Sequence, residues 1–140
     1  MNANVNTSDV RSAFVTGGKR GIGRGIAYAL AESGFDVVIG DWSQDSDVEE
    51  TLRGIRERGQ LADFVLCDVA DLSNHESVIN SVEKAIGPLT CLVNNAGIRK
   101  DQLLMWMSNE EWKTVLGIGL DGFFNVTRLI IKGMLVKKYG

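Results

Sequence analysis

The sequence is poor in the residues that secreted and metal-dependent proteins use as frameworks. Its 140 residues include two cysteines, Cys67 and Cys91, one histidine, His75, and one proline. No Cys-x-x-Cys pair and no histidine–cysteine cluster at ligand spacing is present, so we expect neither a disulfide framework nor a metal site. Each cysteine lies in or beside a short apolar run, which predicts buried, reduced thiols. His75 lies in a polar helix start, where we expect a solvated side chain.

Positive charge and long apolar runs are also scarce. The net charge is −3 and the pI is about 5.1, which argues against a nucleic-acid partner or an anionic membrane. No apolar run approaches the ~20 residues of a bilayer-spanning helix, so we expect no membrane partner. The opening MNANVNTSDVR has neither the cationic nor the apolar segment of a secretory signal. We therefore expect a cytoplasmic protein, and the length predicts a single domain.

Short apolar runs alternate with segments of helical period along the chain. Residues 12–17, 35–40, 61–69 and 89–97 are short and apolar and predict strands. After each of them, apolar residues recur at three- and four-residue spacing, which predicts an amphipathic helix. The last helical segment extends from Trp112 toward Lys138.

Two of these helices begin with the sequence pattern of a capping box. Ser73 with Glu76, and Ser108 with Glu111, each place a hydroxyl three residues before a carboxylate. In a capping box these side chains bond reciprocally to the free backbone amides of the first helical turn. We therefore expect one helix to begin at each serine.

The order β-α-β-α-β-α-β-α predicts an α/β fold. Strands that are almost continuously apolar are buried on both faces, so the sheet should be parallel with helices on each side. Right-handed crossovers then predict a Rossmann-type doubly wound sheet with strand order 3-2-1-4. In that order the third and fourth strands lie about 14 Å apart, too far for Cys67 and Cys91 to form a disulfide. We expect one truncated dinucleotide-binding domain over residues 1–140, with residues 1–10 as a disordered tail.

A glycine-rich turn, TGGKRGIG from Thr16 to Gly23, joins the first strand to the first helix. A helix N-terminus offers unpaired N–H groups and partial positive charge, which suit a diphosphate. Side chains at Gly17, Gly21 or Gly23 would obstruct the approach of backbone to phosphate, or of helix to strand. The strict G-x-G-x-x-G pattern is absent, so a tight turn without a ligand is the alternative. A phosphate-binding P-loop is excluded because no G-x-x-x-x-G-K-[ST] occurs.

Three motifs in this order resemble the short-chain dehydrogenase/reductase family. They are TGGKRGIG at 16–23, CDVAD at 67–71 and NNAG at 94–97. The resemblance begins near residue 11, and residues 94–112 look most like the 3-oxoacyl-[acyl-carrier-protein] and acetoacetyl-CoA reductases. It implies NAD(P)-dependent reduction of a carbonyl, such as a 3-oxoacyl thioester, by hydride transfer. The implied partners are the dinucleotide and a small or carrier-bound carbonyl substrate, in a homo-oligomer or in a protein completed by a C-terminal half.

The resemblance also implies a role for residues at every strand end. For Asp68 and Asn94, hydrogen bonding within the loops alone is the alternative. The implied coenzyme-binding residues are Gly17, Lys19, Arg20, Gly21, Ile22 and Gly23 at the phosphates and adenosine ribose, Asp41 and Trp42 beside that ribose, Cys67, Asp68 and Val69 at the adenine, and Asn95, Ala96 and Gly97 beside the nicotinamide ribose, with Asn94 bracing the strand.

The choice between NAD and NADP depends on opposing charges. Asp41 ends the second strand, 18 residues after Gly23, where a carboxylate accepts from both ribose hydroxyls of NAD and repels a 2′-phosphate. Lys19 and Arg20 place two cations near that phosphate and favour NADP, as does the ketoreductase resemblance. Trp42 stands where NADP-preferring relatives often carry an arginine. We predict NAD, because a carboxylate at the ribose excludes more firmly than mobile cations attract.

The sequence contains no candidate proton donor for the reduction. The family resemblance implies a serine and a Tyr-x-x-x-Lys, but Tyr28 is followed four residues later by Glu32, and Tyr139 is the penultimate residue. The asparagine that relatives often carry in the fourth helix is Gly119 here. We therefore predict no catalytic residue in this chain, with the catalytic C-terminal half absent, and no turnover by the chain alone. The alternative is a non-catalytic dinucleotide-binding or interaction module.

Two further features of the last third of the chain need a structural explanation. Gly117, Gly119 and Gly122 each cost a helix about 1 kcal/mol relative to alanine, so we expect either a kink there or close packing. Without a fifth strand, the fourth strand and the apolar side of the last helix should be exposed.

Overall fold

The computed structural model describes residues 10–140, so all but the last residue of the expected tail lies outside the described residues. The strands are β1 Ser12–Thr16, β2 Asp36–Asp41, β3 Ala62–Leu66 and β4 Cys91–Val93. The helices are α1 Gly21–Glu32, α2 Ser46–Arg56, α3 His75–Ile86, α4 Asn109–Leu116 and α5 Gly122–Lys137. A π-helical turn, Gly117–Asp121, connects α4 to α5.

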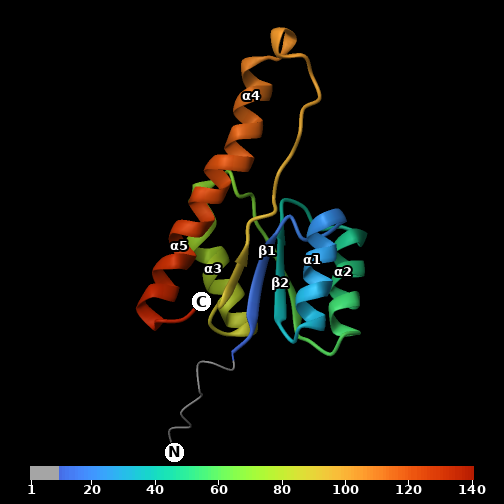
Figure 1. The fold of residues 1–140 in the computed structure, drawn as a ribbon, viewed down its shortest axis with the longest axis vertical. Coiled ribbons are helices and arrows are strands. Elements are labelled where there is room, and N and C mark those ends of the chain that lie inside the picture. The colour runs from blue at the N-terminus through green and yellow to red at the C-terminus, as the bar shows by residue number, and fades with distance from the viewer. Residues whose placement is uncertain (1–9) are drawn as a thin grey trace, which may run out of the picture.

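The four strands form one parallel sheet in the order β3-β2-β1-β4, which confirms the predicted topology. Helices α1 and α2 lie on one side of the sheet, and α3 and α5 lie on the other (Figure 1). All four strands point the same way, so the loops that follow them meet at one edge of the sheet.

The sheet separates two hydrophobic cores. Successive side chains of a strand point to opposite faces, so Val15 and Ile39 pack with α1 and α2, whereas Phe14 and Val38 pack with α3 and α5. All four side chains are fully buried. Burial on both faces is the reason that the central strands are continuously apolar rather than alternating.

Only one of the two predicted capping boxes forms. Ser108 Oγ accepts from the Glu111 amide at 3.1 Å, and Glu111 Oε2 accepts from the Ser108 amide at 2.9 Å, as predicted. The box predicted at Ser73 is wrong. The Asp71 carboxylate accepts from the Ser73 amide at 2.9 Å and begins a 3₁₀ turn, after which α3 starts at His75. The charged Asp71 carboxylate, two residues before Ser73, therefore accepts from the free backbone amide at this helix start in place of a serine hydroxyl.

The glycine cluster lies where α4 meets α5. Gly117 and Gly119 form part of the π-helical turn, and a Cβ on either would have no neighbour within 4 Å. A Cβ on Gly122 would lie 2.5 Å from Val69 Cγ2. The first two glycines therefore accompany an irregular helical turn, and the third permits close packing against the loop after β3.

Helix α4, the π-helical turn and α5 form one continuous rod, Asn109–Lys137, which extends past the sheet (Figure 1). By length, and by the mean hydropathy of 1.4 of an 18-residue stretch within it, this rod could cross a bilayer, although charged residues such as Asp121 and Arg128 interrupt its apolar runs. Its inner side belongs to the protein core, because Val126 and Ile130 are buried there. Core packing thus accounts for part of its apolar character.

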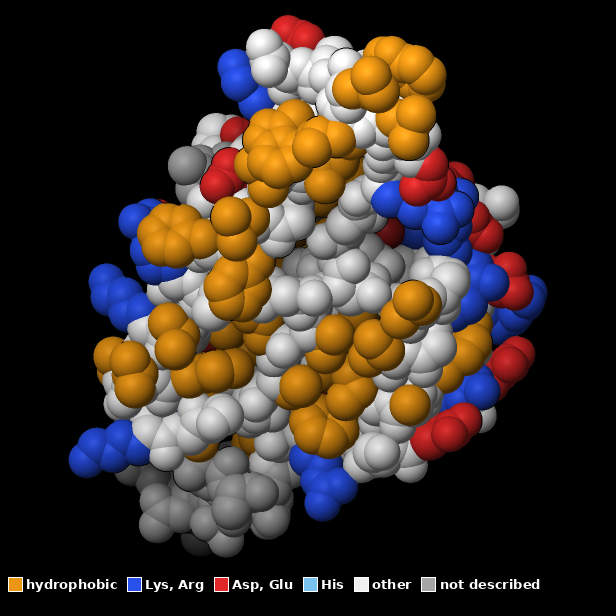
Figure 2. Space-filling view, turned by 45° about the horizontal axis from the view of Figure 1, so that its top comes forward, with side chains coloured by type: hydrophobic (Ala, Val, Ile, Leu, Met, Phe, Trp, Pro, Cys, Tyr) orange, Lys and Arg blue, Asp and Glu red, His pale blue; other side chains and the backbone are white. Residues whose placement is uncertain are grey.

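The outer side of this rod and the outer edge of β4 are exposed, as predicted. Within residues 10–140, β4 pairs with β1 on one side and with no strand on the other. Phe124 and Leu135 are 56% and 72% exposed. Figure 2 shows hydrophobic side chains gathered over the part of the surface where the rod and the preceding loop run.

Candidate functional site

The loops that follow the four strands surround a cavity of about 680 Å³ at the carboxyl edge of the sheet. Ligand sites in proteins commonly measure about 300–1,000 Å³. The cavity lies where the strand order reverses, between β1 and β4, which is the usual ligand site of doubly wound sheets. Every predicted coenzyme-binding residue except Asn94 lines it, and so do Ile98 and Ile118, which the sequence analysis missed.

The glycine turn after β1 brings backbone to the floor of this cavity. The Gly17 amide donates to the Gly40 carbonyl at 2.7 Å. Gly17 has φ +65°, and a Cβ there would lie 2.9 Å from Ala96 Cα, so both conformation and space require glycine. Helix α1 then begins at Gly21 with no side-chain cap. Its first amides are therefore available to an anionic ligand.

Thr16 and Asn95 hold the ends of β1 and β4 together beside the cavity. Thr16 Oγ1 accepts from the amides of Asn95 and Ala96, both at 3.1 Å, and donates to the Val93 carbonyl at 3.3 Å. Asn95 Nδ2 donates to the carbonyls of Thr16 and Gly17 at 3.1 and 3.0 Å. The sequence analysis assigned Thr16 no role, although it is the first residue of the glycine motif.

Asn94 does not belong with the cavity-lining residues. Its Nδ2 donates to Thr127 Oγ1 of α5 at 2.9 Å, and it lines a separate hollow of about 130 Å³ beside Gly119. This places Asn94 as a brace between the end of β4 and α5. This contact agrees with the bracing role that the resemblance implied for Asn94.

Lys19 is not the mobile cation that the sequence suggested. Lys19 is 4% exposed, and its Nζ donates to Ser43 Oγ and Asp45 Oδ2, both at 2.7 Å. Nζ also lies 3.9 Å from Asp41 Oδ1. Sequence reasoning missed Ser43 and Asp45, because only the fold brings the start of α2 to the glycine turn.

The end of β2 presents a carboxylate and an indole to the cavity. Asp41 is 7% exposed, and its Oδ1 accepts from the Trp42 amide at 3.0 Å. The Trp42 ring is exposed, with its centroid 5.2 Å from Lys19 Nζ. Of the two predicted cations, Arg20 alone is exposed.

The loop after β3 is anchored by the helices behind it. Val69 is buried against Gly122, and its carbonyl accepts from Asn125 Nδ2 at 3.1 Å. Asp68 is exposed, and its Oδ1 accepts from the Ala70 amide at 3.0 Å. One of its two carboxylate oxygens thus forms the hydrogen bond within the loop that was considered as the alternative to binding a coenzyme.

His75 is buried, contrary to the expected solvated side chain. The residue is 3% exposed, and its Nε2 lies 3.2 Å from the Asp68 carbonyl. Because α3 begins at His75, the ring points under the loop that carries Asp68. The polar neighbours in the sequence gave no indication of this position.

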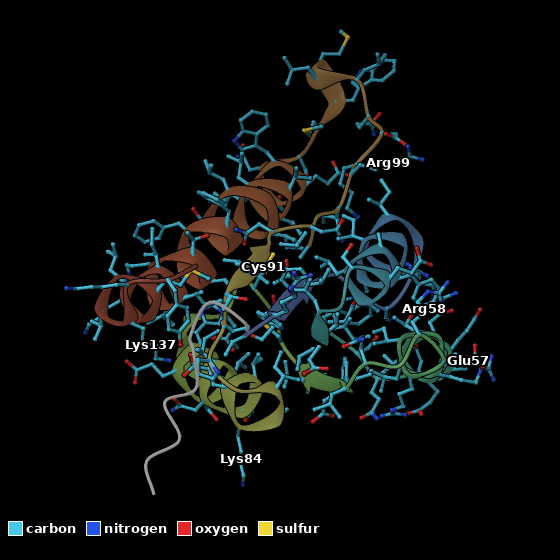
Figure 3. The ribbon with its side chains drawn as sticks, turned by 60° about the horizontal axis from the view of Figure 1, so that its bottom comes forward. Glu57, Arg58, Lys84, Cys91, Arg99 and Lys137 are labelled. Carbon is cyan, nitrogen blue, oxygen red and sulfur yellow. The ribbon has the colours of Figure 1, made fainter. Side chains whose placement is uncertain are left out.

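Both cysteines are free, and their burial differs. Cys67 is buried at the cavity, whereas Cys91 is only half-buried on the edge strand β4, toward the middle of the view in Figure 3. The prediction of a buried thiol thus holds for Cys67 and is only partly right for Cys91.

Burial raises the pKa of the Cys67 thiol to about 11, with smaller contributions from the carboxylates of Asp68 and Asp41. A raised pKa keeps the thiol neutral, so at about pH 8 roughly one thiol in a thousand is ionised. We expect iodoacetamide to alkylate Cys67 about a hundredfold more slowly in the folded chain than in urea. Peptide-resolved mass spectrometry measures both rates. Equal rates would contradict the buried position of Cys67.

Comparisons with known proteins agree with this geometry. The short chain dehydrogenase family matches residues 11–140. The 3-oxoacyl-[acyl-carrier-protein] reductase FabG of Staphylococcus aureus is 38% identical over 130 residues, which cover 93% of this chain and 53% of that protein. The acetoacetyl-CoA reductase of Paracoccus denitrificans is 38% identical over 128 residues, covering 91% and 51%.

A solved structure shows the same fold. The 3-oxoacyl-[acyl-carrier protein] reductase of Brucella melitensis, in complex with NAD, is 37% identical and superposes with a TM-score of 0.83 over 90% of this chain and 49% of that one. The chain therefore spans about half the length of the relatives that it matches. Its strand order, its glycine turn and the match over residues 11–140 show that the chain belongs to the short-chain dehydrogenase family.

Proposed function

We propose that this chain is the coenzyme-binding half of a cytoplasmic NAD(P)-dependent oxidoreductase that reduces a carbonyl, in particular a 3-oxoacyl thioester. The observation that supports it most is the cavity at the carboxyl edge of the sheet, lined by residues from all four strand ends. The names of the Staphylococcus and Paracoccus relatives support the substrate class.

The residues around the cavity fit a dinucleotide. The uncapped start of α1 would hold the diphosphate, because its free amides and partial positive charge favour an anion. Asp41 would accept from the adenosine ribose, and Asp68 and Val69 would flank the adenine. Asn95 to Gly97 would lie along the nicotinamide ribose. The reduced coenzyme would supply the hydride.

The charges around Asp41 favour NAD over NADP. Lys19 is buried and paired with Asp45, so it adds little positive charge for a 2′-phosphate. Arg20 is then the remaining exposed cation of the motif, and the negative charge of Asp41 opposes its attraction for a phosphate. A carboxylate that is 7% exposed loses little of its field to solvent and repels a phosphate strongly.

The proton donor is proposed to lie outside these 140 residues. Reduction needs an acid beside the developing alkoxide, and neither tyrosine has a lysine four residues later. The exposed apolar side of α5 and the open edge of β4 suit a covering C-terminal half or a second subunit, since both features invite pairing. Residues 1–140 would then form a single dinucleotide-binding domain.

We expect the purified chain to bind NADH and to leave it unoxidised in the presence of acetoacetyl-CoA. Calorimetric titration measures binding, and the absorbance of the reduced nicotinamide measures turnover, with the acetoacetyl-CoA reductase of Paracoccus as the control. Binding without turnover supports the proposal. Turnover by the chain alone would contradict the assignment of the donor, and absence of binding would contradict the site.

The missing Tyr-x-x-x-Lys equally supports a second function, a non-catalytic dinucleotide-binding or interaction module. The coding sequence downstream of codon 140 distinguishes the two. A serine followed by Tyr-x-x-x-Lys supports the oxidoreductase, whereas a stop codon supports the module.

A further inference from the structure

Lys19 and Asp45 form a short ion pair next to Asp41 at the rim of the cavity. Lys19 Nζ lies 2.7 Å from Asp45 Oδ2 and 3.9 Å from Asp41 Oδ1. Lys19 and Asp41 line the cavity, but Asp45 does not. We propose that Asp45 is a positioning residue for coenzyme choice: it holds the Lys19 ammonium and thereby makes the cavity reject the 2′-phosphate of NADP. This inference rests on the proposed dinucleotide site.

Asp45 serves two partners with its two carboxylate oxygens. Oδ1 accepts from the Asp47 amide at 3.1 Å and caps α2, while Oδ2 accepts from Lys19. The hydrogen bond from Lys19 holds the pKa of Asp45 below its usual range. The ion pair is therefore present throughout the neutral range of pH, where coenzymes bind.

The backbone of Lys19 cannot move away from this pair. Its carbonyl accepts from Thr51 Oγ1 at 2.7 Å and from Arg24 Nη2 at 2.9 Å. Thr51 is fully buried, so this anchor is shielded from water. Only the side chain of Lys19 can change direction, and Asp45 with Ser43 determines that direction.

The local charge explains the selectivity. Lys19, Asp41 and Asp45 sum to +1 − 1 − 1 = −1, whereas a 2′-phosphate carries about −2. Neutralising Asp45 brings the sum to zero and releases an ammonium that already lines the cavity. NAD has only a hydroxyl at this position, so its affinity should depend much less on the change.

The test compares NADPH and NADH by calorimetric titration of the 140-residue chain. In Asp45→Asn we expect the ratio of the NADPH Kd to the NADH Kd to fall about tenfold. Asparagine caps a helix as well as aspartate, so α2 should keep its start, and thermal unfolding checks this. Asp45→Ser also keeps a capping oxygen and removes the charge, so it should show the same fall. Agreement between the two variants assigns the effect to the lost charge rather than to the shape of the new side chain.

Asp47→Asn is the matched control. Asp47 lies in the first turn of the same helix and pairs with Arg24 rather than with Lys19. Asp47→Asn removes one negative charge from the same region. We expect its ratio of the NADPH Kd to the NADH Kd to stay within about twofold of that of the original chain. A fall as large as that of Asp45→Asn would show a general charge effect and overturn the inference.

A second variant assigns the effect to Lys19. In the double variant Asp45→Asn with Lys19→Gln the gain in NADPH affinity should disappear, because the released ammonium is gone. If the double variant keeps the gain in NADPH affinity, or if Asp45→Asn leaves the Kd ratio unchanged, the inference is overturned. The proposed dinucleotide site is not affected by either result. If neither nucleotide binds the original chain or any variant, both this inference and the proposed function fall.

Discussion

Replacing Gly23 with alanine is expected to destabilise the chain by about 3 kcal/mol and to abolish NADH binding. A Cβ at Gly23 would lie 2.1 Å from the Gly17 carbonyl oxygen and 2.6 Å from Asn95 Nδ2. Neither atom can yield easily, because the Gly17 amide is bonded to Gly40 and Asn95 is bonded to two carbonyls. Helix α1 must therefore move away from the turn, and its amides then leave the cavity.

Gly25→Ala in the same helix is the control. A Cβ at Gly25 has no neighbour within 4 Å, and alanine is favoured over glycine in a helix by up to about 1 kcal/mol. We expect this variant to unfold at a higher urea concentration than the original chain and to bind NADH unchanged. If Gly23→Ala unfolds together with the original chain and still binds NADH, the close contact between α1 and the turn is refuted.

Replacing Thr16 with valine is expected to cost about 3 kcal/mol of folding free energy, because it removes one oxygen that accepts from two amides. Thr16 is 2% exposed, so water cannot readily replace that oxygen. Valine has nearly the same shape, and the loss therefore reports the hydrogen bonds rather than a cavity. The loop of Asn95 and Ala96 should loosen, and NADH affinity should fall with it.

Thr16→Ser separates the hydroxyl from the methyl group. Serine keeps the oxygen, so we expect it to retain most of the stability and of the NADH affinity that valine loses. Urea denaturation and calorimetric titration measure the two quantities on the same samples. A serine variant as unstable as the valine variant would show that the methyl contact, and not the clamp between β1 and β4, carries the effect.

The topology could be predicted because the two central strands are apolar at nearly every position. Phe14 and Val15 are neighbours in the sequence and face different cores, and such a strand is stable only with helices on both sides. The glycine motif could be placed because it follows the first strand directly. These features depend on local sequence, which explains why the strand order and most of the cavity were predictable.

The errors at the site involve contacts between distant segments. Lys19 meets Asp45 across 26 residues, and nothing in either segment alone shows that α2 starts beside the turn. His75 is polar and has polar neighbours, but its burial depends on where α3 begins. Asn94 was expected to brace the strand, but its partner Thr127 lies 33 residues away on α5 and could not be identified from the motif.

The π-helical turn at Gly117–Asp121 has a geometric consequence for the whole rod. A π-helical turn contains one residue more than an α-helical turn. The side chains that follow it are therefore rotated about the helix axis by about 100° relative to those of α4. The stripe of Gly122, Val126 and Ile130 that meets the core is aligned by that offset. Inserting or deleting one residue in this turn would rotate a different stripe inward, whereas the same change in the 98–103 loop would leave the alignment of α5 intact.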